Sequence, residues 1–328
     1  RIERGVFTDA IQPGKVTKKD VQKAWQRYIL KEVGAKTFAG LHILADAGSG
    51  MAATFLPLVK EKLAADIDVL FPELDGTFPS RASDPTLKKN QAQIQKQLKA
   101  THTYDFGISF DGDADRIAFF DEKGIYINSA AIGALVAQHL LKTHPQAKLG
   151  YTVLTSRAYQ EVIKEGGGKP VRMKVGHAFI KKTMREKDVL FACEHSGHFY
   201  YQDYFYTDSV MRTLLIVLKE YEAAKKRGLT FSQLVRPLAR YSQTEDVIIE
   251  VDDKKSALER TADYLHKKVP LRLEKYDGYT VDFGDVWGVI KPSVTEFALK
   301  VLFESKSARH AKNVQLEVIE HIKKIAKK

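Results

Sequence analysis

The sequence predicts an α/β protein, with two consecutive α/β domains whose mixed sheets have related topology, followed by a smaller α+β C-terminal domain. Its 328 residues, 44% of them hydrophobic, are enough to build sizeable cores in two or three domains. Helix-like and strand-like stretches alternate through residues 17–241, and the order strand–helix–strand–helix occurs twice. From about Ser242 the strands follow one another more closely, which is typical of an antiparallel α+β module.

Residues 17–128 are expected to form the first α/β domain, and residues 1–16 to be a remnant of a preceding domain or a linker. After Thr17 apolar residues recur at helical spacing, and Gly34 stands where a helix cap is expected. An apolar strand then runs into a glycine turn and a helix, the opening of a βαβ unit. The expected strands are residues 41–45, 67–71, 105–110 and 117–120, and the further helices are residues 52–63 and about 86–99.

Residues 129–241 repeat this alternation as a second domain, and residues 242–328 form the third. The second domain is expected to have helices at residues 130–141, 157–165, 177–186 and 209–226, strands at 148–154, 171–175 and 189–192, and a loop at 193–208. The third is expected to have strands at residues 246–251, 279–283, 286–290 and 298–304, and helices at 256–268 and from about 308.

Composition narrows the classes of function. A single cysteine, Cys193, excludes a disulfide framework within the chain and indicates a reducing compartment. We find no signal peptide and no apolar run long enough to span a bilayer, so we expect a cytoplasmic protein without a membrane partner. The net charge of +11 is spread over helices, and neither an RNA-binding motif nor the spacing of a zinc motif occurs. We therefore expect no nucleic-acid partner, and the positive charge suits an anionic substrate.

Three aspartates, Asp111, Asp113 and Asp115, stand at alternate positions between two strand-like runs. Carboxylates that converge in a tight turn repel one another unless a cation neutralises them. Gly112 would allow the backbone angles that such a turn requires. Ligands made only of oxygen favour Mg²⁺ or Ca²⁺ over zinc. The position at the end of a strand, where α/β sites form, favours a metal site over a solvated acidic turn.

Two other classes of protein have similar acidic loops. An EF-hand needs glycine at the sixth loop position, where Arg116 stands, and a helix where the strand-like residues 117–120 follow, so it is excluded. An aspartyl-phosphate phosphatase also places Asp-x-Asp after an apolar strand, and Asp111 could then be a nucleophile. That alternative stays open, although the third aspartate favours a metal site made wholly of side chains.

A second polar cluster follows the expected strand at residues 189–192. Its members are Glu194, His195, Ser196 and His198, around a glycine. Acceptors, donors and titratable groups this close together suit recognition of a polyhydroxylated ligand and proton transfer. Because it follows a strand, we expect this cluster to line a site at a strand end.

Two further segments are typical of anion-binding sites. Lys174 and His177 lie at the expected start of a helix, where backbone N–H groups favour anions. The polar residues of the loop 291–297 that could hold a phosphate are Lys291, Ser293 and Thr295. The segment DAGSG (46–50) lacks the residues of a P-loop or a dinucleotide fingerprint, so we expect a packing turn there.

These motifs, in this order, resemble the α-D-phosphohexomutase family and, within it, the bacterial phosphomannomutase/phosphoglucomutase branch. The matching segments, from about residue 40 to 304, are DAGSG, LDGTFP, FDGDADR, VGHAFIKKTMRE, CEHSGHFYYQDYF and KPSVTE. The resemblance implies four domains around a cleft, three of shared α/β topology and a smaller α+β fourth. It implies a Mg²⁺-dependent isomerase whose first-domain phosphoserine interconverts hexose 1-phosphate and 6-phosphate, of mannose or glucose, through a bisphosphate sugar.

The resemblance also implies roles for residues at matching positions. The residues implied in binding Mg²⁺ are Asp111, Asp113 and Asp115. Arg116 would help to hold the reacting phosphoryl group, and His177 and His198 would line the sugar site as candidate proton-transfer groups. The residues implied in binding substrate are Lys174, His177, Glu194, Ser196, Lys291, Ser293, Thr295 and Lys300.

Two departures from the family pattern bear on function. The family's phosphate loop commonly reads Arg-Pro-Ser-Gly-Thr-Glu-Pro, whereas Lys291 lacks the bidentate contact of arginine and Val294 resists a positive φ. The family's Thr-Ala-Ser-His-Asn-Pro serine loop does not occur in the sequence, so we expect that this chain does not run the mutase cycle by itself. A non-catalytic sugar-phosphate-binding or regulatory protein therefore stays an alternative. The preferred hexose and the oligomeric state, monomer or dimer, stay open.

Overall fold

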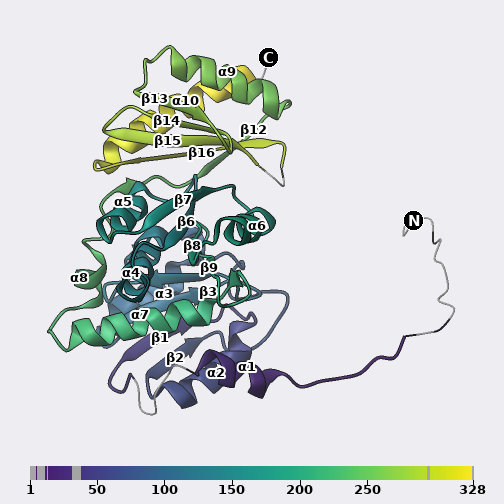
Figure 1. Ribbon diagram of the computed structural model, residues 1–328, viewed down its shortest axis with the longest axis vertical. Helices are drawn as coiled ribbons and strands as arrows, with labels where there is room; N and C mark the ends of the chain where they lie inside the picture. The colour runs from purple at the N-terminus through teal and green to yellow at the C-terminus, as the bar shows by residue number, and fades with distance from the viewer. Residues whose placement is uncertain (1–4, 6–11, 13, 32–37, 294–295, 327–328) are drawn as a thin grey trace. The chain divides into compact units, whose positions relative to one another are not determined.

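Three β-sheets, each with its own helices, organise the chain in the computed structural model (Figure 1). The structure describes residues 5, 12, 14–31, 38–293 and 296–326. The chain divides into two units after residue 34, and the predicted domain limits at residues 129 and 242 fall within the second unit and stay a prediction. In the first unit, helix α1 (Gln22–Ile29) forms where the apolar spacing predicts it, whereas the predicted cap at Gly34 lies outside the described residues.

The first sheet belongs to residues 42–127 of the second unit. Its elements are β1 (His42–Asp46), α2 (Ala52–Leu63), β2 (Asp66–Leu70), η2 (Lys88–Asn90), α3 (Ala92–Thr101), β3 (Phe106–Phe110), β4 (Ile117–Phe120) and β5 (Tyr126–Ile127). The strand order is β2-β1-β3-β4-β5. Strand β1 pairs in parallel with β2 and β3, and the later pairs β3–β4 and β4–β5 are antiparallel. Helical crossovers join the parallel strands, and short loops join the antiparallel ones.

The second sheet belongs to residues 129–235. Its elements are α4 (Ser129–Thr143), β6 (Lys148–Thr152), α5 (Arg157–Glu165), β7 (Lys169–Met173), α6 (His177–Lys187), β8 (Phe191–Cys193), β9 (Phe199–Tyr201), β10 (Thr207–Asp208), α7 (Val210–Lys225) and α8 (Phe231–Val235). The strand order is β10-β9-β8-β6-β7, with β6 parallel to β7 and β8, and with β9 and β10 antiparallel. Strand for strand this is the pattern of the first sheet, so the predicted pair of mixed sheets with related topology is confirmed.

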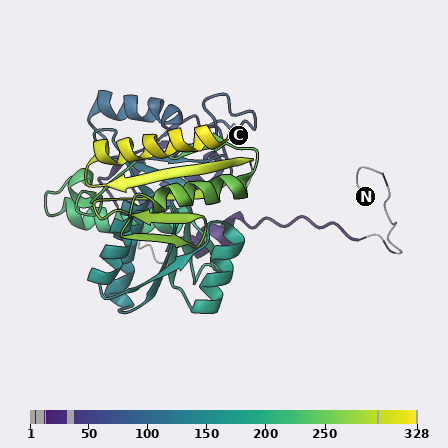
Figure 2. The same ribbon diagram turned by 90° about the horizontal axis from the view of Figure 1, so that it is seen from above.

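The third sheet is antiparallel throughout its described pairs, as the α+β prediction requires. Its elements are β11 (Ser242–Gln243), β12 (Val247–Glu250), α9 (Lys254–His266), β13 (Arg272–Lys275), β14 (Tyr279–Asp282), β15 (Val286–Pro292), β16 (Ala298–Ser305) and α10 (Ala308–Ala326). Alternate residues of β16, namely Leu299, Val301 and Phe303, join one apolar cluster with both helices. Helices α9 and α10 therefore cover the same face of this sheet (Figure 2).

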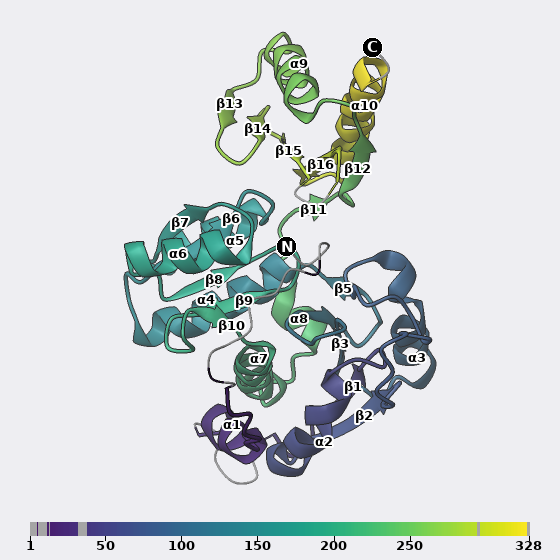
Figure 3. The ribbon, with the colours of Figure 1, turned by 90° about the vertical axis from the view of Figure 1, so that its right-hand side faces the viewer.

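Helices of the second sheet also cover the first sheet. Phe106 of β3 stacks on Phe231 of α8 with ring centroids 4.6 Å apart, and meets Tyr221 of α7 edge-on at 5.7 Å. Figure 3 shows α8 beside the strands of the first sheet. On the opposite face, Ile94 and Leu98 of α3 pack with strand residues in a separate cluster. Aromatic contacts of this kind bury large apolar areas, so the first two sheets share a core that fixes their loops relative to each other.

The helix predicted from about Thr86 begins only at Ala92, which corrects that prediction. The Asp84 carboxylate accepts hydrogen bonds from both the N–H and the hydroxyl of Thr86, forming a local turn. Further along, Gln91 donates through its amide to the carbonyl groups of residues 85 and 86. Aspartate side chains compete with helical hydrogen bonding in this way, and the segment therefore stays a turn followed by η2.

The predicted loop at residues 193–208 contains two strands, β9 and β10, which is a second correction. Strand β9 is buried on both faces, so its run of aromatic residues shows no alternation that would identify a strand. The elements β5, β11, β13 and α8 were also not predicted. Each has two to five residues, which is too short for a period to be recognised in the sequence.

Candidate active site

Two loops occupy the same place in the first two sheets. Residues 111–116 join β3 to β4, and residues 194–198 join β8 to β9. The loops touch, because the N–H of Ile117 donates to the carbonyl of Gly197 at 3.2 Å. Gly197 has a φ of +92°, and a Cβ there would lie 3.0 Å from the carbonyl oxygen of Ile117, so glycine is favoured. The two polar clusters predicted from the sequence therefore meet in one place.

The three aspartates of the first loop converge. One carboxylate oxygen from each of Asp111, Asp113 and Asp115 lies within 4.8 Å of the others. Asp111 is buried, Asp115 is half-buried and Asp113 is exposed, so the cluster faces outward from a buried base. Burial raises the pKa of Asp111 to about 6, and the charge of Asp115 acts in the same direction. A cation held by all three oxygens would remove this repulsion, so the donor set fits Mg²⁺.

Arg116 supports the buried end of this cluster. Its N–H donates to Asp111 Oδ1 at 3.1 Å, and its Nε donates to Oδ2 at 2.7 Å. Its Nη1 reaches Asp84 Oδ2 at 3.0 Å, in the turn that precedes η2. The guanidinium is thus held between two carboxylates and can hold a further anion beside the loop only where its remaining N–H groups are free.

A buried ion pair lies beneath the acidic loop. Arg81 donates from Nε to Asp46 Oδ2 at 2.8 Å, and from Nη2 to Ser109 Oγ at 2.9 Å and to the carbonyl of Phe110 at 2.7 Å. The ion pair fixes the segment that carries Asp84 against the end of β3. The sequence predicted only turns around Arg81. The ion pair could not be predicted, because Asp46 and Ser109 lie far from Arg81 along the chain.

Asp46 opens the DAGSG segment, which forms a turn packed against its neighbours. Asp46 Oδ1 accepts a hydrogen bond from the N–H of Gly48 at 2.8 Å. A Cβ at Gly50 would lie 2.7 Å from the carbonyl oxygen of Gly112, so this turn touches the acidic loop through its backbone.

Two imidazoles face the third aspartate. His198 Nε2 lies 3.2 Å from Asp115 Oδ1, and His177 Nε2 lies 3.9 Å from Asp115 Oδ2. The two rings meet edge-on with centroids 4.5 Å apart. Desolvation alone would lower the pKa of His198, but hydrogen bonds to Asp115 and Glu194 raise it to about 9. Burial and the neighbouring imidazole lower the pKa of His177, so the two rings differ in protonation near neutral pH.

Glu194 connects the second loop to helix α6. The hydroxyl of Tyr200 donates to its Oε2 at 2.8 Å, and the N–H of Gly176 approaches its Oε1 at 3.4 Å. Its Oε2 also lies 3.4 Å from His198 Nδ1, to which Ser196 Oγ comes within 2.7 Å. Burial opposes ionisation of Glu194, but its contacts with His198 outweigh this and lower its pKa. The side chains of the polar cluster are therefore held in place by one another.

The third sheet carries a positively charged side chain, Lys291, that belongs to neither loop. Lys291 is buried at the end of β15, and its Nζ lies 2.8 Å from Asp277 Oδ2. The same Asp277 oxygen accepts a hydrogen bond from the N–H of Val175 at 3.0 Å, in the segment before α6. Asp277 thus ties Lys291 to the Lys174–His177 segment, and nothing in the sequence near Asp277 indicates this role.

The remaining predicted substrate-binding residues are dispersed. Ser293 is buried, and its Oγ has no hydrogen-bond partner within the described part of the chain. Lys300 pairs with Asp246 at 3.6 Å. Lys174 is exposed, with Nζ 5.9 Å from the ring centroid of Phe179. Thr295 lies outside the described residues.

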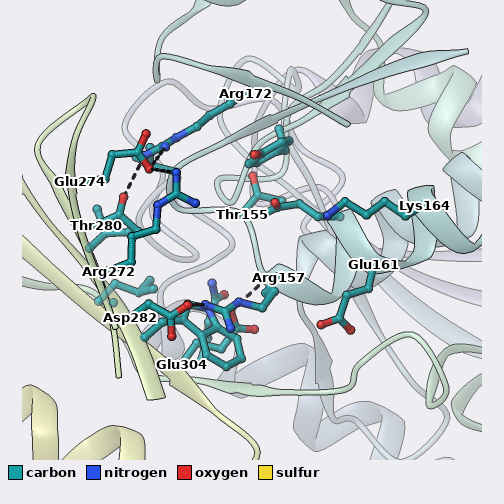
Figure 4. Close-up of a pocket in the computed structure, with 18 residues that line it drawn as sticks. Thr155, Arg157, Glu161, Lys164, Arg172, Arg272, Glu274, Thr280, Asp282 and Glu304 are labelled. Atoms are coloured by element: carbon teal, nitrogen blue, oxygen red, sulfur yellow. Dashed lines mark hydrogen bonds and ion pairs between the residues drawn. The ribbon is translucent and has the colours of Figure 1, made fainter. Parts of the chain in front are cut away.

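A polar cavity of about 320 Å³ lies between α5 and the third sheet (Figure 4). Arg157 pairs with Asp282 at 2.7 Å, and Arg172 pairs with Glu274 at 2.8 Å, across this seam. Glu304 of β16 accepts a hydrogen bond from the N–H of Arg157, the first residue of α5, at 3.1 Å. The residues that line this cavity include none of the predicted site residues, so we interpret it as the polar seam that joins the second and third sheets.

Comparisons with known proteins show the family of the chain. Models of phosphoglucomutase/phosphomannomutase alpha/beta/alpha domains II and III match residues 23–124 and 128–241. The chain belongs to the phosphoglucomutase/phosphomannomutase family. Among its curated relatives are phosphohexose mutases of Xanthomonas campestris, 31% identical over 86% of this chain and 62% of the relative, and a phosphomannomutase of Salmonella montevideo, 29% identical over 87% and 63%.

Solved structures of the family share the fold. A phosphoglucomutase/phosphomannomutase family protein from Burkholderia thailandensis superposes with a TM-score of 0.82 at 26% identity, over 94% of this chain and 65% of that one. A putative phosphomannomutase from Thermus thermophilus superposes with a TM-score of 0.75 at 16% identity, over 95% and 68%. The chain spans somewhat less than two thirds of the curated family members named above. No helix among the described residues is long and apolar enough to cross a membrane.

Proposed function

We propose that this chain provides the metal-, sugar- and phosphate-binding parts of a phosphohexomutase, which interconverts hexose 1-phosphate and 6-phosphate of mannose or glucose. The observation that carries the proposal is the meeting of two loops in a member of this family. The carboxylates of residues 111–115 lie against the imidazoles and the buried acid of the second loop. The groups that we propose to bind the cation and the sugar hydroxyls thus lie side by side.

The first loop is proposed to hold Mg²⁺ through Asp111, Asp113 and Asp115. Bound there, Mg²⁺ would act as a Lewis acid that neutralises charge on a transferring phosphoryl group. Arg116 keeps Asp111 ionised and oriented through two hydrogen bonds, and is proposed to help hold the phosphoryl oxygens. Positioning and neutralisation of charge are what phosphoryl transfer chiefly requires of a protein.

The second loop is proposed to bind the sugar. Glu194 and Ser196 offer acceptor and donor atoms for the hydroxyl groups of a sugar. The hydroxyl of Tyr200 orients Glu194 by donating a hydrogen bond to it. His177 and His198 lie within contact of each other beside the metal loop, and can hold or move a proton at Nε2. The opposite pKa shifts of the two imidazoles suit one as a donor and the other as an acceptor.

The third sheet is proposed to hold the non-reacting phosphate. The buried hydroxyl of Ser293, which has no hydrogen-bond partner among the described residues, and the buried ammonium group of Lys291 support an anion site at the end of β15. Lys300, Thr295 and Lys174 are proposed as further contacts to this phosphate. Asp277 already neutralises the charge of Lys291, and lysine lacks the bidentate contact that arginine makes with a phosphate. We therefore expect weaker phosphate binding than an arginine at this position would give.

The phosphoryl carrier is not among these residues, because the family's Thr-Ala-Ser-His-Asn-Pro signature does not occur in the sequence. We therefore propose that this chain, assayed by itself, binds hexose phosphates without turning them over. An aspartyl-phosphate phosphatase is less favoured, because Asp111 is 2% exposed and both of its oxygens accept hydrogen bonds from Arg116. A nucleophile would need a free, accessible oxygen.

Two measurements test the proposal. Isothermal titration calorimetry of the chain with mannose 6-phosphate and glucose 6-phosphate should show binding that weakens in Ser196→Ala. The variant His42→Ala, altered away from both loops, should bind as the unaltered chain does. A coupled assay for conversion of hexose 1-phosphate to 6-phosphate, run on the protein as its gene encodes it, should detect turnover. The absence of binding would defeat the site assignment, and binding without any conversion would favour a sugar-phosphate-binding or regulatory protein.

A further inference from the structure

Asp115 is shared by two different groups of ligands. With Asp111 and Asp113 it forms the all-oxygen cluster described above, and with His177 and His198 it forms a second group of ligand atoms within 4.8 Å of one another. The three residues of the second group come from the β3–β4 loop, the first turn of α6 and the end of the β8–β9 loop. Their proximity therefore depends on the packing of the two sheets and is not visible as a spacing in the sequence.

We propose that Asp115, His177 and His198 form a binding site for a divalent transition-metal ion such as Zn²⁺, separate from the Mg²⁺ site and sharing Asp115 with it. Three protein ligands and an open fourth position are typical of accessible zinc sites. Metal–ligand distances of about 2.0–2.1 Å place neighbouring ligand atoms of a tetrahedral site roughly 3.4 Å apart. His198 Nε2 lies 3.2 Å from Asp115 Oδ1 and His177 Nε2 lies 3.9 Å from Asp115 Oδ2, so each imidazole is close to that spacing from one oxygen of the carboxylate.

The outer nitrogens of both imidazoles support this assignment. Metal-ligating histidines usually donate their second ring N–H to a carboxylate, which fixes the tautomer and the ring orientation. His198 Nδ1 lies 3.4 Å from Glu194 Oε2, and His177 Nδ1 lies 3.4 Å from Asp208 Oδ1. Both rings thus present Nε2 to Asp115. Their Nδ1 atoms face outer acceptors, which are Asp208 for His177, and Glu194 together with the nearer Ser196 Oγ, at 2.7 Å, for His198.

The donor sets of the two sites differ in the ions that they select. Imidazole suits Zn²⁺, Cu²⁺ and Ni²⁺, whereas carboxylates alone suit Mg²⁺. An ion at the second site would occupy the Nε2 atoms of His177 and His198 and take one oxygen from the Mg²⁺ cluster. A transition-metal ion should therefore inhibit sugar-phosphate turnover by the protein as its gene encodes it. That consequence rests on the proposed function, whereas the binding itself does not.

The test is a titration of the metal-free chain with Co²⁺, followed by its visible absorption, and with Zn²⁺, followed by calorimetry in the presence of excess Mg²⁺. One equivalent of Co²⁺ should give the intense absorption of a four-coordinate ion, and Zn²⁺ should displace it. His177→Ala should lower the Zn²⁺ affinity by about 100-fold or more, and the outer-carboxylate variant Asp208→Asn by about tenfold. His177 is 38% exposed in its side chain, so we expect its variant to fold.

Two control variants keep the result specific. His42→Ala alters a group formed by the half-buried His42 and the exposed Asp66 and Asp68. This group also brings one imidazole and two carboxylates together, and its loss should leave the Zn²⁺ affinity unchanged. Asp113→Asn should weaken Mg²⁺ binding and leave Zn²⁺ binding intact. Unchanged Zn²⁺ affinity in His177→Ala, or its loss in His42→Ala, would overturn the proposal. Because no sugar is present, a failed mutase assay would leave this outcome unaffected.

Discussion

The first two sheets share one topology, and we propose that their equivalent loops bind different ligands. In each, the third strand leads through a short loop into an antiparallel fourth strand, and the two loops touch through Ile117 and Gly197. The first loop exposes Asp113 and half-buries Asp115 above the buried Asp111, whereas the second buries its single carboxylate, Glu194, among hydrogen-bond donors. The shared topology determines where a loop lies, and the residues within the loop determine what it binds. This agrees with the rule that function resides in sites placed on common folds.

This difference in burial predicts that substituting an exposed acid of the first loop and substituting the buried acid of the second loop have different effects on stability. A buried, hydrogen-bonded carboxylate supports the fold, because its removal leaves partners without an acceptor. An exposed carboxylate in a repulsive cluster supports ligand binding and contributes little to stability. Substitutions that change charge but little volume can separate these two effects.

The largest effect is expected for Glu194→Gln. Glu194 is 5% exposed and faces the donors of Tyr200 and His198, so loss of its charge should lower the free energy of unfolding by about 3 kcal/mol. Urea unfolding at pH 7 measures this change. The matched substitution in the first loop, Asp113→Asn, should change the free energy of unfolding by less than about 0.5 kcal/mol. Equal losses in the two variants would remove the distinction between the loops.

The next largest effect is expected for Asp113→Asn on metal binding. Removing one of three carboxylates should lower the Mg²⁺ affinity by about 30- to 100-fold, which calorimetric titration of Mg²⁺ would detect. Ser196→Ala, in the second loop, should leave the Mg²⁺ affinity within about twofold of the unaltered chain. If Ser196→Ala weakened Mg²⁺ binding as much as Asp113→Asn did, the cation would not belong to the first loop alone.

A smaller effect is expected from the titration of His198. Its pKa is raised from the usual 6.5 to about 9 by Asp115 and Glu194, against the cost of burial. The resulting stability is present below pH 6.5 and is lost as the pH rises through about 9. Between pH 6.5 and 8.5 the chain should lose roughly 2 kcal/mol of unfolding free energy that His198→Gln does not lose. Parallel pH profiles for the two proteins would show that folding does not raise the pKa of His198.

The smallest effects are expected where the two loops turn. Gly197 has a φ of +92° against the carbonyl of Ile117, so Gly197→Ala should cost about 1 to 2 kcal/mol. Ala114 has a φ of +60° in the acidic loop, so Ala114→Gly should relieve strain and change stability by less than about 1 kcal/mol. Thermal unfolding of both variants measures the difference. A destabilised Ala114→Gly would show that the left-handed turn is not strained.

The sequence predicted where the loops lie, because the apolar runs before them are strands that can be recognised locally. Strand β4 and helices α2 and α5 follow the predicted limits, since periodicity and turn residues mark both ends. Strands β9 and β10 were not predicted, because buried aromatic runs and pairs of residues show no period. The fold class was therefore predictable even though several short edge elements were not.

The candidate site was predictable only in its central residues. The aspartates and the residues of the second loop can be recognised from local sequence patterns. The residues that hold the site in place through hydrogen bonds are distant along the chain and cannot. Asp84 lies 32 residues from Arg116, and Asp277 lies 102 residues from Val175. Pairs of this kind arise from tertiary packing, and a single aspartate in a turn or a hairpin carries no signal of its partner.

The central claim is that equivalent loops of two related sheets form one site, with the cation on the first and the sugar on the second. A crystal structure of the chain with Mn²⁺ in place of Mg²⁺ and with glucose 1-phosphate tests this most directly. We predict an anomalous peak among Asp111, Asp113 and Asp115, and sugar hydroxyl groups in contact with Glu194 and Ser196. A metal peak away from these aspartates, or a sugar bound away from residues 194–198, would contradict the account.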